Sequence, residues 1–418
     1  MLKVGRYTAA LVLVLVGGAV MADKLAGTSL IPKLVHWWPV LFIMLGFEYI
    51  LSNRRHGQEE RPLRLDLGGI IFAVVVAAVV IVTVQSPGVW KGLEGFRGLG
   101  STSIAGVFEA FSDGQKFDKG VTKIPAADVK QIKIVNTNGN MKIQPGNVEQ
   151  IEVSLSVYVN TDNAEEAADI ADASRMDHQL EGDTLEIRTV PKEYGFKVMG
   201  RRKPRMDMTV TVPANLQADW DVRLVNGQIV ASRLLLGERF VAEAVNGEIS
   251  VQQLAGTVEL KATNGQLKAD KTEGDLSLKL TNGSLEVSEH RGAARLKATN
   301  AESVITGHSG DVEIDMTNGA IRVDGELGQL RTQSSSASVK IAASRIGGNW
   351  DVMTKHGKLD LLLPSDGSYT VEGVGGFGSV QSDLPLTVDK KSISGTVGGG
   401  TYRVLAETKG ALAVQRLN

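Results

Sequence analysis

The stretch KATNGQLKA, from Lys261 to Ala269, decides the fold because close copies of it recur along the chain. An Asn-Gly pair between alternating apolar residues is a strong local signal for a tight hairpin. Here the asparagine returns at steps of 20, 18, 18, 18 and 18 residues, in a column that we call the turn ladder: Asn226, Asn246, Asn264, Asn282, Asn300 and Asn318. A period this regular indicates a stacked repeat.

A second column, of glycines, keeps the same period. Its members are Gly256, Gly274, Gly292, Gly310, Gly328 and Gly348. Between the two columns, apolar and polar residues alternate, as in GDLSLKLTNGSLEVSEHR over residues 274–291. Alternation with period two is typical of strands. Each repeat therefore contains two short strands, joined by the Asn-Gly pair and followed by a looser corner at the second glycine.

These patterns predict an all-β fold, a parallel β-solenoid (a single-stranded β-helix) with rungs of about 18 residues. In such a coil the Asn-Gly pairs turn corners, and each strand pairs with its copy one rung away, about 4.8 Å along the axis. The stacked Asn side chains are then expected to hydrogen-bond from rung to rung. A β-meander, in which the same pairs close true hairpins, is the alternative.

Three apolar runs precede the repeats, at residues 8–22, 34–51 and 67–84. The last two approach the ~20 residues that a helix needs to cross a bilayer. Lys3 and Arg6 precede the first run, and four arginines crowd the loop 52–66 between the second and third. Positive residues favour the cytoplasm. We therefore expect a multi-pass protein of the cell membrane, with a cytoplasmic N-terminus and an extracellular C-terminal domain. The first run could alternatively be a cleaved signal peptide.

The expected organisation has four parts. Residues 1–85 form a region of three transmembrane α-helices, and 86–125 form a linker. Residues 126–215 form a β-rich lead-in segment with a helical insertion, and 216–418 form the solenoid. The chain has no cysteine, which excludes disulfides, thiolate metal sites and a cysteine nucleophile. A net charge of −2 argues against a nucleic-acid partner.

Two resemblances rest on quoted residues. HWWPVLFIMLGFEYIL, residues 36–51, resembles the tryptophan-proline hairpin of the Lia-type membrane-stress proteins of Gram-positive bacteria. VNGEI, ATNGQL and LTNGSL, together with MDMTVTVPANLQADWDVRLVNGQI over 206–229, resemble the β-strand-repeat "putative adhesin" family, which is related to the toastrack domains. This second resemblance covers about 130–418. It implies an extracytoplasmic β-solenoid linked to envelope stress or adhesion, and it carries no catalytic residues.

Two basic features are candidate binding sites. Lys261, Lys279 and Lys297 recur at the rung period, and stacked like charges repel. We interpret this lysine stripe as a site for an anionic ligand, the alternative being an ordinary solvated face. The second feature is the basic loop GRRKPR, which could contact lipid headgroups or wall polymer through Arg201, Arg202, Lys203 and Arg205.

One histidine pair is a weaker candidate. His290 and His308 lie one period apart, and Glu326 follows in the same column. Zn²⁺ accepts nitrogen and oxygen ligands of this kind. The ordinary interpretation, two exposed corner residues, is favoured. We therefore expect no metal, no cofactor and no catalytic residue.

The function predicted from these features is that of a membrane-anchored extracytoplasmic solenoid that binds a ligand or partner and senses or modulates envelope stress. The alternative is a surface adhesin or structural spacer without signalling. A polysaccharide-active enzyme on a β-helix is disfavoured, because no long loops separate the rungs. The expected partners are the lipid bilayer, a membrane sensor kinase or related stress proteins, and anionic wall polymer or lipid headgroups.

Overall fold

A computed structural model describes residues 3–4, 64–65, 114–161, 163–195 and 202–417 of the 418. The chain divides into two compact units, Met1–Thr102 and Ser103–Asn418. In the first unit, β1 (Lys3–Val4) and β2 (Arg64–Leu65) form a short parallel pair. The three apolar runs expected to span a membrane lie outside the described residues. Among the residues that are described, no helix is both long enough and apolar enough to cross a bilayer.

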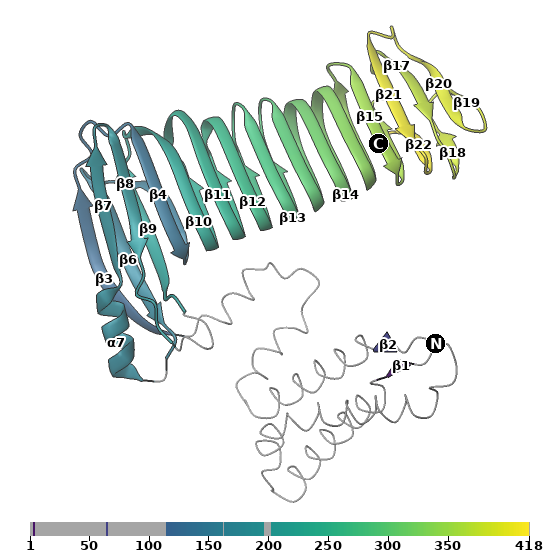
Figure 1. The fold of residues 1–418 in the computed structure, drawn as a ribbon. Coiled ribbons are helices and arrows are strands. Elements are labelled where there is room, and N and C mark those ends of the chain that lie inside the picture. Colours follow the sequence, from purple (N-terminus) through teal and green to yellow (C-terminus); the bar gives the residue numbers. More distant parts are fainter. Residues whose placement is uncertain (1–2, 5–63, 66–113, 162, 196–201, 418) are drawn as a thin grey trace, which may run out of the picture. The chain divides into compact units, whose positions relative to one another are not determined.

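The middle of the second unit is a coil of stacked β-rungs (Figure 1). Each strand in it pairs in parallel with the next, and apart from register shifts near Ala218 in β10 and Leu235 in β11 the pairing is in register, so that Asn246 lies opposite Asn264 and Asn264 opposite Asn282. The prediction that the Asn-Gly pairs turn corners of a parallel coil is confirmed by this pairing, and the hairpin alternative is wrong. The strands are β10 (Gln217–Ser232), β11 (Leu235–Gln252), β12 (Ala255–Asp270), β13 (Leu276–Ser288) and β14 (Ala294–Ile346).

Glycine makes the tight Asn-Gly corner possible. Gly265 has a φ of +138°, and a Cβ at this position would collide with the carbonyl oxygen of Gly247 in the rung below. Only glycine tolerates both the left-handed backbone and such close stacking. Ala301 replaces glycine in one rung, and its φ lies outside the left-handed region.

Alternation along each strand fills the coil with aliphatic side chains. Leu276, Leu278 and Leu280 are each at most 2% exposed, whereas Ser277 and Lys279 between them face solvent. One continuous buried cluster runs from Ile124 to Val414. The core therefore joins all the rungs, and no rung needs a core of its own.

At the N-terminal end, the chain forms further rungs and then closes them with antiparallel strands. β4 and β5 form the earlier rung expected at Ile132 and pair in parallel with β10. On their other side, β8 pairs in parallel with β4, and β9 with β5. Antiparallel strands follow: β7 pairs with β8, β6 with β9, and β3 with β6. The strands are β3 (Gln115–Ile124), β4 (Gln131–Asn138), β5 (Met141–Gly146), β6 (Ile151–Val159), β7 (Arg175–Glu181), β8 (Thr184–Val190) and β9 (Arg205–Pro213). Because β3 is a paired strand, the expected linker to residue 125 is wrong over residues 115–124.

The helix expected in the lead-in segment is present as α7 (Ala164–Ala173). It begins at Asn163, whose side chain accepts hydrogen bonds from the backbone N–H groups of Glu165 and Glu166. This is the usual way of satisfying the first free N–H groups of a helix. Its buried Ala167 and Ile170 belong to the same apolar cluster as residues of β6, so α7 covers this end of the sheet.

At the C-terminal end, the simple coil stops after β15 and β16. The next strands along the chain, β17 and β18, lie one rung farther out, and β21 and β22 return to fill the gap. β20 then pairs antiparallel with β17 and with β19. The prediction of one parallel solenoid to residue 418 is therefore wrong beyond β16. The strands are β15 (Trp350–His356), β16 (Leu359–Leu363), β17 (Tyr369–Val374), β18 (Val380–Ser382), β19 (Thr387–Val388), β20 (Ser392–Val397), β21 (Tyr402–Thr408) and β22 (Leu412–Arg416).

Candidate functional site: the outer columns of the coil

The turn ladder is one chain of amide hydrogen bonds along the coil. The side-chain Nδ2 of each asparagine donates to Oδ1 of the asparagine one rung earlier, at 2.7 to 3.0 Å. All six predicted residues take part. The structure adds Asn138, which accepts from Asn226 across 88 residues of sequence. Its Asn-Gly pair was visible in the sequence, but the long insertion hid its place in the column.

The lysine stripe is brought together as predicted, but it is not uniformly basic. Lys261, Lys279 and Lys297 lie directly opposite one another in adjacent rungs. Lys261 Nζ lies 3.2 Å from Glu243, and Lys297 Nζ lies 3.4 Å from Asp315. Among the described residues, only Lys279 of the three has no carboxylate partner. The stripe is thus one free cation between two ion pairs.

The basic loop does not form a free cationic patch in the part that is described. Arg201 lies outside the described residues. The backbone of Arg202 pairs with Tyr194, and Lys203 Nζ lies 4.0 Å from Glu193. Arg205 binds the carboxylate of Asp207 through two nitrogens and also lies over an aromatic ring. The positive charges of the described loop are largely neutralised where they stand.

The two histidines are buried, so the expectation of exposed corner residues is wrong. His290 and His308 are each 1% exposed, and their rings stack with centroids 5.3 Å apart. Their column begins with Leu234 and Leu254 and passes through Thr272. The corner thus turns its side chains inward. The column position was visible in the sequence, where leucines occupy it two and three rungs before His290.

The surroundings of the two histidines favour uncharged imidazoles packed in the core over a pair of metal ligands. Thr272 holds Nδ1 of His290 through its hydroxyl at 2.9 Å and its carbonyl at 3.0 Å. Both ring nitrogens of His308 lack a hydrogen-bond partner. Burial lowers the pKa of both imidazoles, to about 4 for His308, on which neighbouring His290 acts in the same direction. Glu326 is exposed, and the described residues contain no cluster of potential metal ligands.

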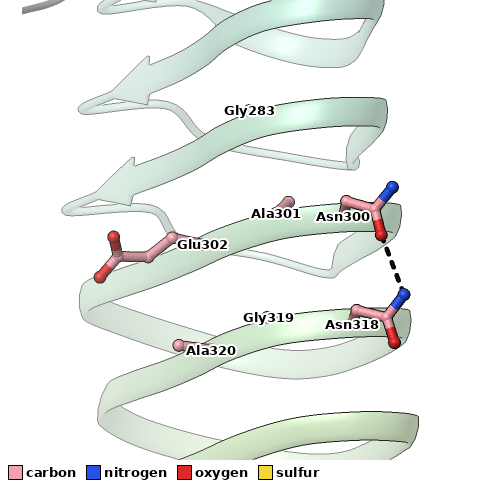
Figure 2. Close-up of a pocket in the computed structure, with 7 residues that line it drawn as sticks. All are labelled: Gly283, Asn300, Ala301, Glu302, Asn318, Gly319 and Ala320. Atoms are coloured by element: carbon pink, nitrogen blue, oxygen red, sulfur yellow. Dashed lines mark hydrogen bonds between the residues drawn. The ribbon is translucent and has the colours of Figure 1, made fainter. Parts of the chain in front are cut away.

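A shallow hollow of about 420 Å³ lies beside the turn ladder where Ala301 replaces glycine (Figure 2). Figure 2 shows the bonded amides of Asn300 and Asn318 on one side and the Glu302 carboxylate on the other. Glu302 is already bound to Arg322, at 2.6 Å. The lining therefore offers one neutralised carboxylate and small side chains, whereas a small-molecule site usually joins an apolar pocket to several convergent polar groups.

Solved structures that resemble this chain include two weak likenesses. A "putative cell adhesion protein" from Clostridium sporogenes ATCC 15579 shares 9% identity over 72% of this chain and 100% of its own, with a TM-score of 0.19. A "putative adhesin" from Parabacteroides distasonis ATCC 8503 shares 12% identity over 59% of this chain and 97% of its own, with a TM-score of 0.29. No curated protein matches the chain. The profile of one family matches residues 129–410, which is most of the β unit, and the chain therefore belongs to the Toastrack DUF4097 family.

Proposed function

We propose that this chain is a membrane-anchored protein of the bacterial surface, whose β-coil is a rigid arm that binds and does not catalyse, as in an adhesin or structural spacer. The observation that carries this proposal is the unbroken in-register stacking marked by the turn ladder. With about 4.8 Å for each rung, the bonded asparagines extend for roughly 30 Å. An arm of this kind holds its two ends at a fixed separation.

The ends of the coil support the same proposal. An open stack exposes unpaired backbone groups at its last rung and tends to add further chains. Here the edge strand β3 has a bulge and three lysines, and the edge strand β19 is only two residues long, and such features discourage a further strand from pairing. Capped ends favour an arm of defined length over a growing fibre.

The outer columns also support binding in preference to catalysis. Along one of them, Glu313 lies 3.6 Å from Arg295 and 3.7 Å from Arg331, in the rungs before and after it. Such exposed pairs neutralise each other and contribute at most about 1 kcal/mol each. Catalysis needs titratable groups that converge on one reacting atom. Charges spread along a column are better suited to holding the rungs in register.

Membrane anchoring is part of this proposal and rests on the apolar runs at 8–22, 34–51 and 67–84. The pairing of Lys3 with Arg64 is compatible with it, because both belong to segments expected in the cytoplasm. A second candidate function is a sensor of envelope stress that acts through a membrane sensor kinase. The tryptophan-proline motif HWWP at residues 36–39 favours this second function.

A shortened arm tests the proposal. Deleting residues 276–311 removes two periods and joins Gly274-Asp275 to Val312, which recreates the local sequence Gly310-Asp311-Val312. Because each rung contacts only its neighbours, the remaining coil should close, about 10 Å shorter. Wall-less cells that express the full chain or the shortened chain are compared for cell-to-cell aggregation, before and after external protease.

We expect both chains to promote aggregation, and protease to abolish it while segment 53–66 stays intact. Aggregation that is lost with the two deleted rungs would place a specific binding site there and contradict the spacer. A β unit that external protease cannot reach would contradict the orientation. Release of sugars from wall glycan by the purified chain would overturn the non-catalytic assignment. If deletion of the gene alters the cell's response to wall antibiotics while aggregation never depends on the chain, the sensor function replaces the proposal.

A further inference from the structure

The C-terminal end of the coil carries exposed apolar side chains, which we call the Phe377 tip. Phe377 is 89% exposed, whereas the other exposed large apolar residues of the unit, which include Val374 at 54% and Val388 at 43%, are 41–56% exposed. The loop that carries Phe377 joins β17 to β18, at the end of the coil opposite β3, β7 and α7 (Figure 1). A phenylalanine ring at such an end loses apolar burial unless something else covers it.

The tip is held in place by its backbone. The N–H of Gly375 donates to the carbonyl of Lys391 at 2.8 Å, and the N–H of Phe377 donates to the carbonyl of Lys409 at 2.6 Å. A Cβ on Gly376 would collide with the backbone of Lys409. Glycine therefore lets this loop lie flat on the neighbouring strands, and the ring points outward from a fixed support. Fixed display lowers the entropy lost on binding.

The rim of the tip is positively charged. Lys390, Lys391 and Lys409 are exposed, and none of them has a carboxylate partner among the described residues. Of the nearby acids, Glu372 binds Arg403 at 2.6 Å, whereas Asp389, which accepts the backbone N–H of Lys390, and Glu407, which lies opposite Val374, have no cationic side-chain partner among the described residues. This differs from the middle of the coil, where lysines pair with acids of the next rung. The tip thus combines an unburied aromatic ring with three unpaired lysines, which outnumber the two unpaired acids beside them.

We infer that the Phe377 tip docks on an anionic lipid surface, an inference that rests on the proposed function as a surface arm and names what its far end contacts. The phenylalanine enters the boundary between headgroups and acyl chains, and the lysines extend along it to reach the phosphates. One apolar insertion is weak by itself, and a basic cluster supplies the second contribution that stable attachment needs. Free phosphate would bind the lysines but would leave the ring exposed.

The experiment uses the full chain in phosphatidylcholine nanodiscs, floated with vesicles of either phosphatidylcholine alone or phosphatidylcholine mixed with phosphatidylglycerol. We expect binding to the anionic vesicles only, weakening with salt. Phe377→Ser should weaken it roughly 10- to 100-fold, as expected for one buried aromatic side chain. Replacing Lys390, Lys391 and Lys409 by glutamine should cost about fivefold for each lysine at low salt.

Two matched controls make the result specific. Val121→Ser removes an apolar residue that is 56% exposed on β3, at the other end of the coil. Replacing Lys130, Lys142 and Lys340 by glutamine makes the same change of charge at exposed lysines outside both the tip and the lysine stripe. Both should bind as the parent does. Unchanged binding by Phe377→Ser, or equal losses in the controls, would overturn the tip assignment.

A partner of the Phe377 tip other than lipid would give a different result in these experiments. Self-association of the chain without lipid that Phe377→Ser abolishes would make a second copy the partner and overturn the lipid inference. The proposed function is tested separately, by cell aggregation after external protease and with the shortened arm. Neither of these assays depends on Phe377. Cells that aggregate normally with Phe377→Ser would refute the tip and leave the arm in place.

Discussion

Replacing His308 with leucine should make the coil resistant to acid. The neutral imidazole is buried, and both of its nitrogens lack partners. Its pKa is lowered to about 4, first by burial and then by His290. Backbone groups of Ala293 and Thr272 at His290 and of Asp311 and Gly310 at His308, followed by the charges of Asp275 and Asp311, raise the pKa of the two rings and are outweighed. Leucine is the residue that the same column carries at position 254, so the side chain has a precedent in this environment.

The direction of the pH effect follows from which state binds protons. The unfolded chain takes up a proton at His308 near pH 6.5, whereas the folded chain does so near 4. Stability from this residue is therefore complete above about pH 6.5 and is lost as the pH falls toward 4. The full loss amounts to about 3 kcal/mol, and about 2 kcal/mol of it should have occurred at pH 5.

Hydrogen exchange of the full chain in detergent measures this loss locally. After correction for the intrinsic exchange rate, peptides that cover residues 285–310 should open roughly 30-fold more readily at pH 5 than at pH 7. His308→Leu should remove most of that difference and should change little at pH 7. His356→Gln, at an exposed histidine, is the control and should behave as the parent. An equal increase in exchange in the parent and in His308→Leu would refute the argument that His308 limits acid stability.

Three further predictions concern the outer columns. Asn282→Ala should cost about 1 to 2 kcal/mol of unfolding free energy in urea, because it breaks hydrogen bonds to the rungs on both sides. Gly265→Ala should cost at least about 2 kcal/mol in the same assay, through a strained φ and a backbone collision, whereas Ala301→Gly should be nearly neutral. Lys279→Gln should leave stability unchanged or raise it by a few tenths of a kcal/mol, and should reduce co-sedimentation with anionic wall polymer.

The middle of the coil was predictable because its determinants are local and repeated. Each Asn-Gly corner fixes the backbone, and the alternation that follows fixes which side chains enter the core. A slip of one residue would expose every leucine of a strand such as β13. Since all rungs obey the same rule, the register between them follows from the period of the sequence alone.

The ends were not predictable in this way, because each depends on which distant strand fills a free edge. β21 lies between β15 and β17, although β17 comes earlier in the chain. Its sequence alternates like any other rung, and nothing local distinguishes an inserted strand from a following one. β3 was missed for a related reason. Its burial is low and irregular, with a bulge between Asp118 and Val121, so the alternation that identifies a strand is weak.

The candidate sites differ in the same way: the lysine stripe was predictable from the sequence period, and the Phe377 tip was not. The lysine stripe followed from the period, and the same step also reaches Glu243, which pairs with its first lysine. Phe377 has no counterpart one period earlier or later, and it lies in a glycine-rich segment that is typical of an ordinary loop. Its position depends on three backbone hydrogen bonds, from the N–H groups of residues 375, 376 and 377 to carbonyls that follow 16 to 34 residues later in the chain. Only the folded end brings these together.

The two ends of the coil differ in a way that gives the arm a direction. At the N-terminal end, Lys116, Lys119 and Lys123 of β3 pair with carboxylates, and α7 covers the sheet with its buried face. Between the ends, the charged columns are mostly neutralised by pairs that link one rung to the next. At the C-terminal end, three lysines are unpaired and a ring is exposed. Val121 and Leu180 are exposed at the N-terminal end as well, but neither approaches the 89% exposure of Phe377. In the proposed arm, the lipid contact would therefore lie at the C-terminal end while the number of rungs sets the length, so that arm length and binding chemistry can change independently.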